Sequence, residues 1–137
     1  MKKQLTIVLK LCFILATGLV MSACTRQESA LKEAGFAGVY ALVSVDGNPV
    51  PANITHEGTA LQLRSGTFTI NADGTCSTTS VFVPPSGTEI TREVSATYTR
   101  EGSTLTMQWE GAGMTVGTIQ GNTFTMDNEG MVLVYQK

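Results

Sequence analysis

The sequence contains little cysteine and little histidine. Its 137 residues include three cysteines and one histidine. Cys12 lies inside an apolar N-terminal run and Cys24 directly after it, so Cys76 is the only cysteine in the remainder of the chain. A single cysteine cannot form an internal disulfide, so stability must come from apolar burial and hydrogen bonding. Because no histidine or basic residue neighbours Cys76 in the sequence, we expect a small core residue rather than a reactive thiol.

Positive charge is scarce beyond the first 23 residues. That segment holds three of the nine basic residues and none of the eleven acidic ones. The remaining chain therefore carries six basic and eleven acidic residues, a formal charge of −5. Nucleic-acid binding and electrostatic attachment to anionic lipid both require clustered Lys and Arg. The charge balance thus argues against a nucleic-acid partner and against electrostatic binding to a membrane.

The sequence also lacks a recognisable catalytic or metal-binding pattern. His56 is the only histidine, and its neighbour Glu57 is not accompanied by further ligands at metal-binding spacing. A Ser-His-Asp triad would have to use this same His56, which we predict to lie in a flexible loop, and no nucleophile elbow is present. The glycines fall singly at expected turns rather than in a phosphate-binding loop. We therefore expect no enzymatic activity, no metal and no cofactor.

What the sequence does contain, at its start, is the pattern of an export signal. Two lysines precede an apolar run over Leu5–Val20, which leads into the small residues before Cys24. A transmembrane helix is the alternative for this run. However, the run includes Lys10 and falls short of the roughly 20 apolar residues that a spanning helix needs. The pattern favours a signal peptide.

Met21-Ser22-Ala23-Cys24 resembles the lipobox of bacterial lipoproteins, with Met21 where leucine is usual. The resemblance implies that the Cys24 thiol is acylated and that the chain is cleaved before it. An ordinary secretory signal that happens to end at a cysteine is the alternative. We accordingly divide the chain into a signal peptide (1–23), a lipidated N-terminus with a tether (24–37) and a barrel domain (38–137). Thr25 after the cysteine, rather than Asp, implies the outer membrane in an organism that has one.

From Gly38 onward the helical period is absent, and short apolar alternations are separated by turns that contain glycine. In one such stretch, Leu105, Met107 and Trp109 alternate with polar residues, as in a sheet with one buried and one wet face. Eight strands are predicted: Val39–Val45, Thr59–Leu63 continuing into Thr67–Ile70, Thr75–Val83, Glu89–Thr99, Thr104–Trp109, Met114–Ile119, Thr123–Met126 and Met131–Gln136.

The predicted strands must either close on themselves or pack against a second layer. No helix after the tether is long enough to cover a sheet, and the connections from Thr67 on permit only antiparallel neighbours. We therefore predict an all-β fold, an eight-stranded antiparallel up-and-down barrel. A β-sandwich is the alternative. Its crossover would have to use Asn48–Gly58, which we expect to be a loop.

The segment Gly38–Gly47 resembles the opening of bacterial lipocalin-like domains, which reads Gly-x-Trp-x-Leu-x-Ser before a glycine turn; here Tyr40 replaces the tryptophan. Further matches are Gly66–Ile70 and the closing Leu133–Tyr135. The resemblance implies a lipocalin-like barrel that binds or carries a small apolar ligand.

Seven residues are predicted to line a cavity for such a ligand: Phe68, Phe82, Arg92, Tyr98, Met107, Trp109 and Met126. Met114 is a further apolar candidate. Core packing is the alternative role for the apolar members, because an eight-stranded barrel is just wide enough for side chains or one small ligand. Arg92 falls on the apolar face, where it would pair with an acidic headgroup. Alternatively, it reaches solvent near a strand end.

Two functions are consistent with these features. The first is a membrane-anchored envelope lipoprotein that binds or carries a small apolar ligand, with the bilayer as partner through acylated Cys24. The second is a structural, interaction or inhibitor lipoprotein with a filled barrel, whose loops at Pro49–Gly58 and Pro84–Gly87 contact a protein partner. Catalysis is the least supported.

Overall fold

The computed structural model describes residues 35–137. The predicted signal peptide, Cys24 and the tether up to residue 34 lie outside the described residues. The compact unit begins at Phe36, two residues before the predicted domain boundary. Its strands are β1 (Gly38–Val45), β2 (Asn48–Pro49), β3 (Ala52–His56), β4 (Thr59–Ile70), β5 (Thr75–Val83), β6 (Ile90–Glu101), β7 (Thr104–Trp109), β8 (Ala112–Gln120), β9 (Thr123–Asn128) and β10 (Met131–Gln136).

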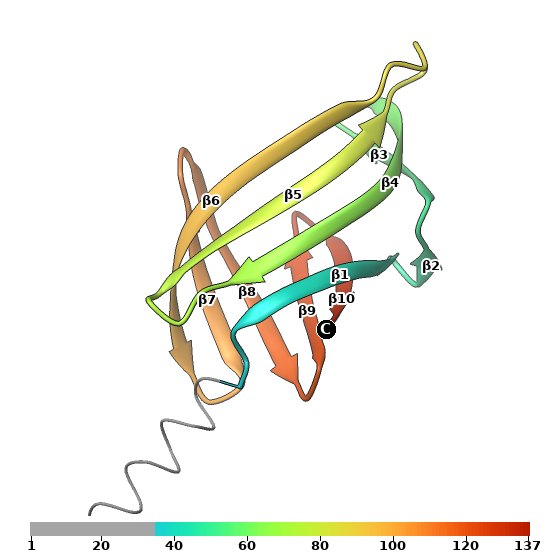
Figure 1. The fold of residues 1–137 in the computed structure, drawn as a ribbon. Helices are drawn as coiled ribbons and strands as arrows, with labels where there is room; N and C mark the ends of the chain where they lie inside the picture. The colour runs from blue at the N-terminus through green and yellow to red at the C-terminus, as the bar shows by residue number, and fades with distance from the viewer. Residues whose placement is uncertain (1–34) are drawn as a thin grey trace, which may run out of the picture. The chain divides into compact units, whose positions relative to one another are not determined.

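The sheet closes into a barrel through β1 (Figure 1). One part of β1, Gly38–Ala41, pairs with β4, and the part over Ala41–Val45 pairs with β10. The remaining strands pair in chain order from β4 to β10, and every pairing is antiparallel. β1 and β4–β10 therefore form an eight-stranded up-and-down barrel. This confirms the predicted fold and rules out the β-sandwich.

The connection between Asn48 and Gly58 is not the flexible loop that we predicted. Within it, β3 pairs with the first part of β4, from Ala52 opposite Leu63 to His56 opposite Thr59. Two prolines, Pro49 and Pro51, precede this strand and its apolar alternation is weak, which concealed it in the sequence. His56 consequently lies on a strand.

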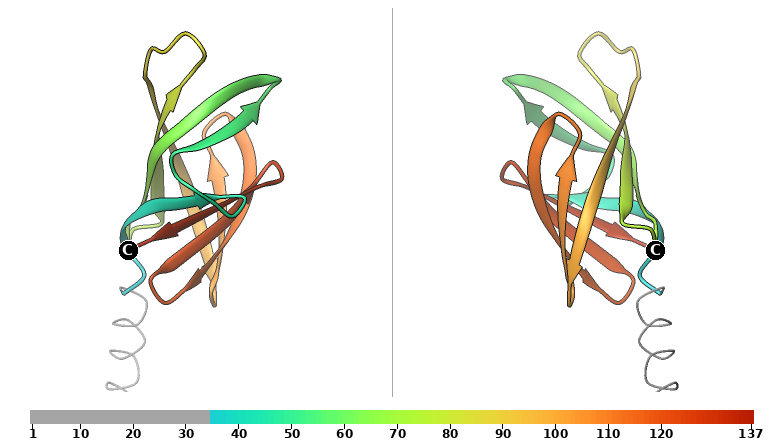
Figure 2. Two further views of the ribbon diagram at one scale, coloured as in Figure 1. Left: turned by 90° about the vertical axis from the view of Figure 1, so that its right-hand side faces the viewer. Right: turned by 90° about the vertical axis from the view of Figure 1, so that its left-hand side faces the viewer.

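The barrel is closed at one end and open at the other (Figures 1 and 2). β7 pairs with β6 only over Ala96–Glu101, and β9 pairs with β8 only over Gly117–Gln120. Beyond these pairs the barrel divides into three parts that are not paired with one another. They are the β3–β6 sheet, the β7–β8 hairpin and the β9–β10 hairpin. We call the end at which these three parts separate the open end.

The centre of the barrel is filled by aromatic side chains. The rings of Phe68 and Phe124 lie 4.5 Å apart between centroids, and those of Phe68 and Tyr135 lie 5.6 Å apart. All three residues are at most 1% exposed, and burial raises the pKa of Tyr135 to about 12. Aromatic pairs at these separations add to the stability that burial alone provides. The inward positions thus form a packed core.

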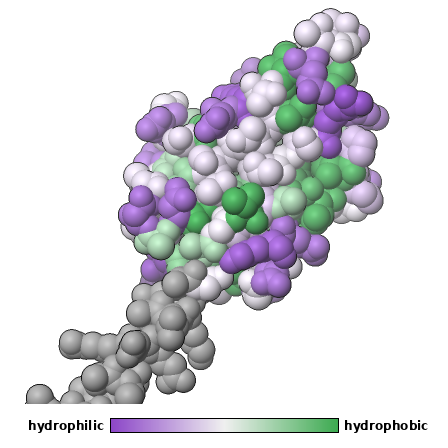
Figure 3. Space-filling view, in the orientation of Figure 1, coloured by the Kyte–Doolittle hydropathy of each residue, from purple (hydrophilic) through white to green (hydrophobic). Residues whose placement is uncertain are grey.

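The outer face of the sheet is rich in hydroxyl groups, as the alternation predicts. Thr67, Thr79 and Thr97 occupy outward positions on β4, β5 and β6. In Figure 3 this side of the barrel is largely of intermediate hydropathy, with separate hydrophobic and hydrophilic patches.

Candidate functional site

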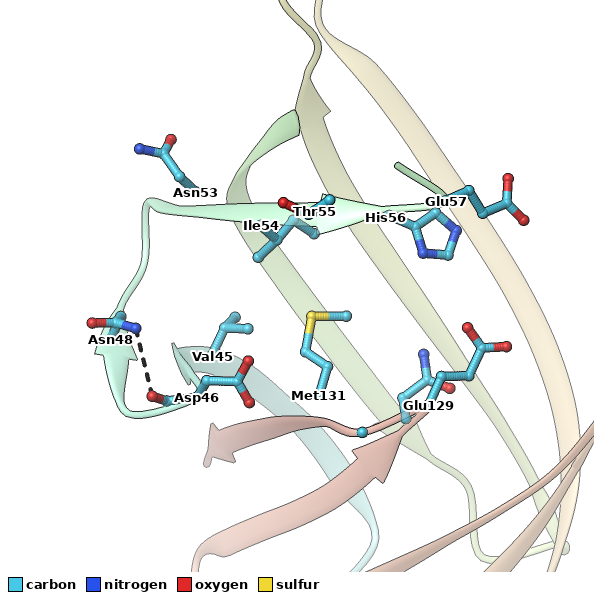
Figure 4. A pocket seen from close by; sticks show the side chains of 12 residues that line it. Val45, Asp46, Asn48, Asn53, Ile54, Thr55, His56, Glu57, Glu129 and Met131 are labelled. Atoms are coloured by element: carbon cyan, nitrogen blue, oxygen red, sulfur yellow. Dashed lines mark hydrogen bonds between the residues drawn. The ribbon is translucent and has the colours of Figure 1, made fainter. Parts of the chain in front are cut away.

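A hollow of about 410 Å³ lies at the open end, between β3 and the turn that joins β9 to β10 (Figure 4). Its volume falls within the ~300–1,000 Å³ that is usual for small-molecule sites. We call it the rim hollow. It is lined by Val45, Asp46, Asn48, Asn53, Ile54, Thr55, His56, Glu57, Asn128, Glu129, Gly130 and Met131.

Three tight turns carry acidic residues to this hollow. Asp46, Glu57 and Glu129 have φ angles of 48°, 49° and 55°, and each precedes a glycine that also has a positive φ. Two successive residues with positive φ form a type I′ turn, whose twist matches that of the flanking antiparallel strands. All three acidic residues line the hollow. The hairpin geometry of the barrel therefore places three carboxylates around one opening.

Asp46 differs from the other two carboxylates because it is already bonded to the barrel. Its Oδ1 accepts a hydrogen bond of 2.8 Å from the Val132 N–H, and its own N–H donates one of 2.8 Å to the Val132 carbonyl. These bonds fix the turn after β1 against β10. Asp46 thus supports the wall of the hollow, whereas Glu57 and Glu129 are exposed at its edge.

Most of the surface that lines the rim hollow is polar, and a smaller part is apolar. Val45, Ile54 and Met131 supply apolar side chains, and Figure 4 shows Ile54 and Met131 on opposite sides of the opening. Around them stand the amides, the Thr55 hydroxyl, the imidazole of His56 and the carboxylates. Among residues 35–137, no Lys or Arg lines it. The arrangement suits a neutral or positively charged ligand that also has an apolar part.

No metal centre forms within residues 35–137, where no group of three or more His, Cys, Asp or Glu side chains is placed to hold an ion. The same part of the chain contains no helix long and apolar enough to cross a membrane. Cys76 lies in the core at 2% exposure, as predicted, and burial raises the pKa of its thiol to about 11.

None of the seven residues that the sequence predicts for a cavity lines the rim hollow. Three of them are core residues: Phe68 and Met107 at 0% exposure and Met126 at 4%. Met114, the further candidate, points outward from β8 and is 66% exposed.

Phe82, Tyr98 and Trp109 are partly buried and pack against the core. The Trp109 indole Nε1 donates a hydrogen bond of 2.9 Å to the hydroxyl of Thr115, which is itself buried. The Tyr98 hydroxyl donates to the carbonyl of Asn71, at the closed end of the barrel. These polar atoms are thus already bonded within the protein.

Arg92 is exposed to solvent. It lies opposite Ser80 on β5, in the part of β6 that extends beyond the end of β7. The alternation pattern therefore predicted correctly which face of the sheet Arg92 lies on. In this part of β6, however, no neighbouring strand encloses that face. This placement corresponds to the alternative in which Arg92 reaches solvent.

The rim residues were missed because they come from three hairpin turns far apart in the sequence. The available signal was the repeated pairing of an acidic residue with glycine, at Asp46-Gly47, Glu57-Gly58 and Glu129-Gly130. That signal indicates turns, but it does not indicate that they meet.

The strand pairings show that residues 35–137 form an eight-stranded antiparallel up-and-down barrel. No family model and no curated protein matches the chain. Among solved structures, it is similar to a lipocalin-like protein from Bacteroides uniformis ATCC 8492, with a TM-score of 0.46 and 13% sequence identity. The similarity covers 75% of this chain and 98% of that one.

Proposed function

We propose that this protein is a binding module that holds a small ligand in the rim hollow of its barrel. The observation that carries the proposal is the hollow of about 410 Å³ at the open end of a barrel whose centre is packed. Small-molecule sites are usually concave with convergent polar groups, and this hollow has such groups around a smaller apolar part. As in the sequence analysis, we propose binding rather than catalysis.

The lining residues restrict the chemical class of the apolar ligand that we expected from the sequence. Ile54 and Met131 would contact an apolar part of the ligand, while Glu57 and Glu129 would accept hydrogen bonds from its donors. An anionic headgroup would face carboxylates, and the described part of the chain contributes no Lys or Arg to the lining that could pair with it. We therefore propose a neutral or cationic amphipathic ligand.

We also propose that acylated Cys24 anchors the protein to the cell envelope, in the outer membrane of a two-membrane organism. The support is the lipobox-like sequence before Cys24. Because two or three acyl chains give stable attachment where one is reversible, the lipid would be sufficient to hold an acidic domain at the bilayer.

Native mass spectrometry of the full chain, extracted from its own membrane, tests the ligand proposal. The expected result is a bound small molecule that Ile54→Trp displaces by filling the hollow. Thr97→Trp is the matched control, since Thr97 lies on the outer face of β6 and does not line the hollow. Circular dichroism would establish that both variants fold. A wild-type spectrum without added mass, or equal loss in both variants, would refute the proposal.

The packed centre favours one alternative, an interaction protein of the envelope with a filled barrel. A ligand in the barrel interior would need the space that core side chains fill. Those of Phe68, Met107 and Phe124 are fully buried there. In that case the loops and strand edges of the open end would contact a protein partner.

A further inference from the structure

One edge of β8 lacks a neighbouring strand. β8 pairs with β7 along nearly its whole length, but with β9 only over Gly117–Gln120. The segment Ala112–Val116, which we call the β8 edge, thus has no strand on its other side within residues 35–137. Figure 1 shows the β7–β8 and β9–β10 turns ending apart from each other.

The backbone groups of the β8 edge can be assigned to sides. Ile119 donates its N–H to the Ser103 carbonyl, which lies on the β7 side. Since successive residues of a strand direct their backbone groups to opposite sides, Gly117 and Thr115 also face β7. The N–H groups of Met114 and Val116 therefore point to the side where β9 is missing. A row of such donors is a template for a further strand.

This edge also lacks the features by which β-proteins usually protect exposed edges. Charged side chains and prolines normally block edge pairing. The free part of β6 carries Arg92 and Glu93, and β3 directly follows Pro51. The β8 edge contains no charge and no proline, and its outward side chains Met114 and Val116 are 66% and 53% exposed.

Acidic groups lie at both ends of the β8 edge. Asp127 follows Met126, which is the last residue of β9 paired with β8, so it lies where the two strands separate. Glu110 precedes β8 at the other end. A strand docked between them would meet a carboxylate at each end, over about 20 Å at ~3.3 Å per residue.

We propose that the β8 edge binds an extended peptide segment of a partner protein by strand addition. The segment has alternating apolar residues and a Lys or Arg at each end of a stretch of about seven residues. Backbone bonds to Met114 and Val116 hold the strand, and Glu110 and Asp127 set its charge preference. A second copy of this chain fits less well, because its own edge is flanked by the same acidic residues. The proposal is independent of a ligand in the rim hollow.

Fluorescence anisotropy tests the proposal with a labelled peptide, Lys-Val-Thr-Val-Thr-Val-Lys, and the full chain in mild detergent. Its symmetry makes the result independent of strand direction. Val116→Pro removes the outward N–H without breaking a bond to β7, a position at which an edge strand tolerates proline. Binding is expected to weaken at least about tenfold, whereas Val116→Thr, which keeps the N–H, changes it about twofold at most.

A second measurement keeps the test decisive if the proline variant unfolds. Amide hydrogen exchange should slow at Met114 and Val116 when the peptide binds, while Thr115 is already protected in the free protein. A peptide with Glu at both ends is expected to bind at least about fivefold more weakly at low salt. Absence of peptide binding, unchanged exchange at both amides, or protection of these amides by self-association alone would overturn the proposal.

Discussion

Replacing Gly117 by alanine is expected to destabilise the barrel by about 2 kcal/mol. A Cβ at this position would lie 2.4 Å from Cε2 and 2.5 Å from Cζ of the Phe124 ring. That ring is completely buried and packs against Phe68 and Tyr135, so it cannot move aside freely. Overpacking of this kind costs about 1–3 kcal/mol of stability. We expect a cost near the upper end of this range because the neighbouring rings hold Phe124 in place. Alanine also restricts the unfolded chain more than glycine does, which offsets about 0.4–1 kcal/mol of this cost.

Gly113→Ala, on the same strand, is the matched control. No atom lies within 4 Å of a Cβ built there, and its φ is not in the left-handed region. This variant is expected to be neutral or slightly stabilised. Urea unfolding followed by Trp109 fluorescence measures both variants. For a domain of this size, 2 kcal/mol corresponds to a lowering of Tm by about 8–16 °C.

Phe124→Leu provides a further check on the cause. If the overlap with the ring is responsible, the loss caused by Gly117→Ala is expected to shrink by at least about 1 kcal/mol in the Phe124→Leu background. Equal stability of Gly117→Ala and Gly113→Ala would refute the close approach of the Phe124 ring to Gly117.

Three further predictions address other parts of the molecule. Because burial raises the pKa of Cys76 to about 11, its thiol is expected to react with iodoacetamide at pH 8 only after unfolding; labelling as fast as in urea would contradict its burial. The hydroxyl and N–H of Thr75 hold the pKa of Asp73 below its usual value. Thr75→Val is therefore expected to raise that pKa in an NMR titration. The stability that these hydrogen bonds add to the folded state is present above the pKa of Asp73 in the unfolded chain, and it is lost as the pH falls through the pKa in the folded protein. Cys24→Ser is expected to release the protein from the membrane fraction, and its retention there would argue against lipid anchoring.

The strands of the barrel could be predicted largely because their signal is local. Leu105, Met107 and Trp109 alternate with polar residues, and the structure turns them all inward on β7. β3 was missed because prolines precede it and its inward positions include His56, so its apolar alternation is weak. Its pairing with β4 depends on contacts that no short sequence window reveals.

Burial along β6 could not be predicted because it depends on a neighbouring strand. Alternation places Arg92 and Ala96 on the same face, yet Arg92 is exposed while Ala96 is 4% exposed. The difference arises because β7 ends opposite Ala96. The rim hollow escaped prediction for a similar reason, since its walls meet only when the barrel closes.

The proposed ligand site in the rim hollow can be tested by a crystal structure of the full chain isolated from its membrane, together with any small molecule it retains. Ligand density is expected at the open end, between Ile54 and Met131, with the side chains of Phe68 and Met107 packed as described. Density among those core side chains, or an open end without a ligand, would contradict binding in the rim hollow.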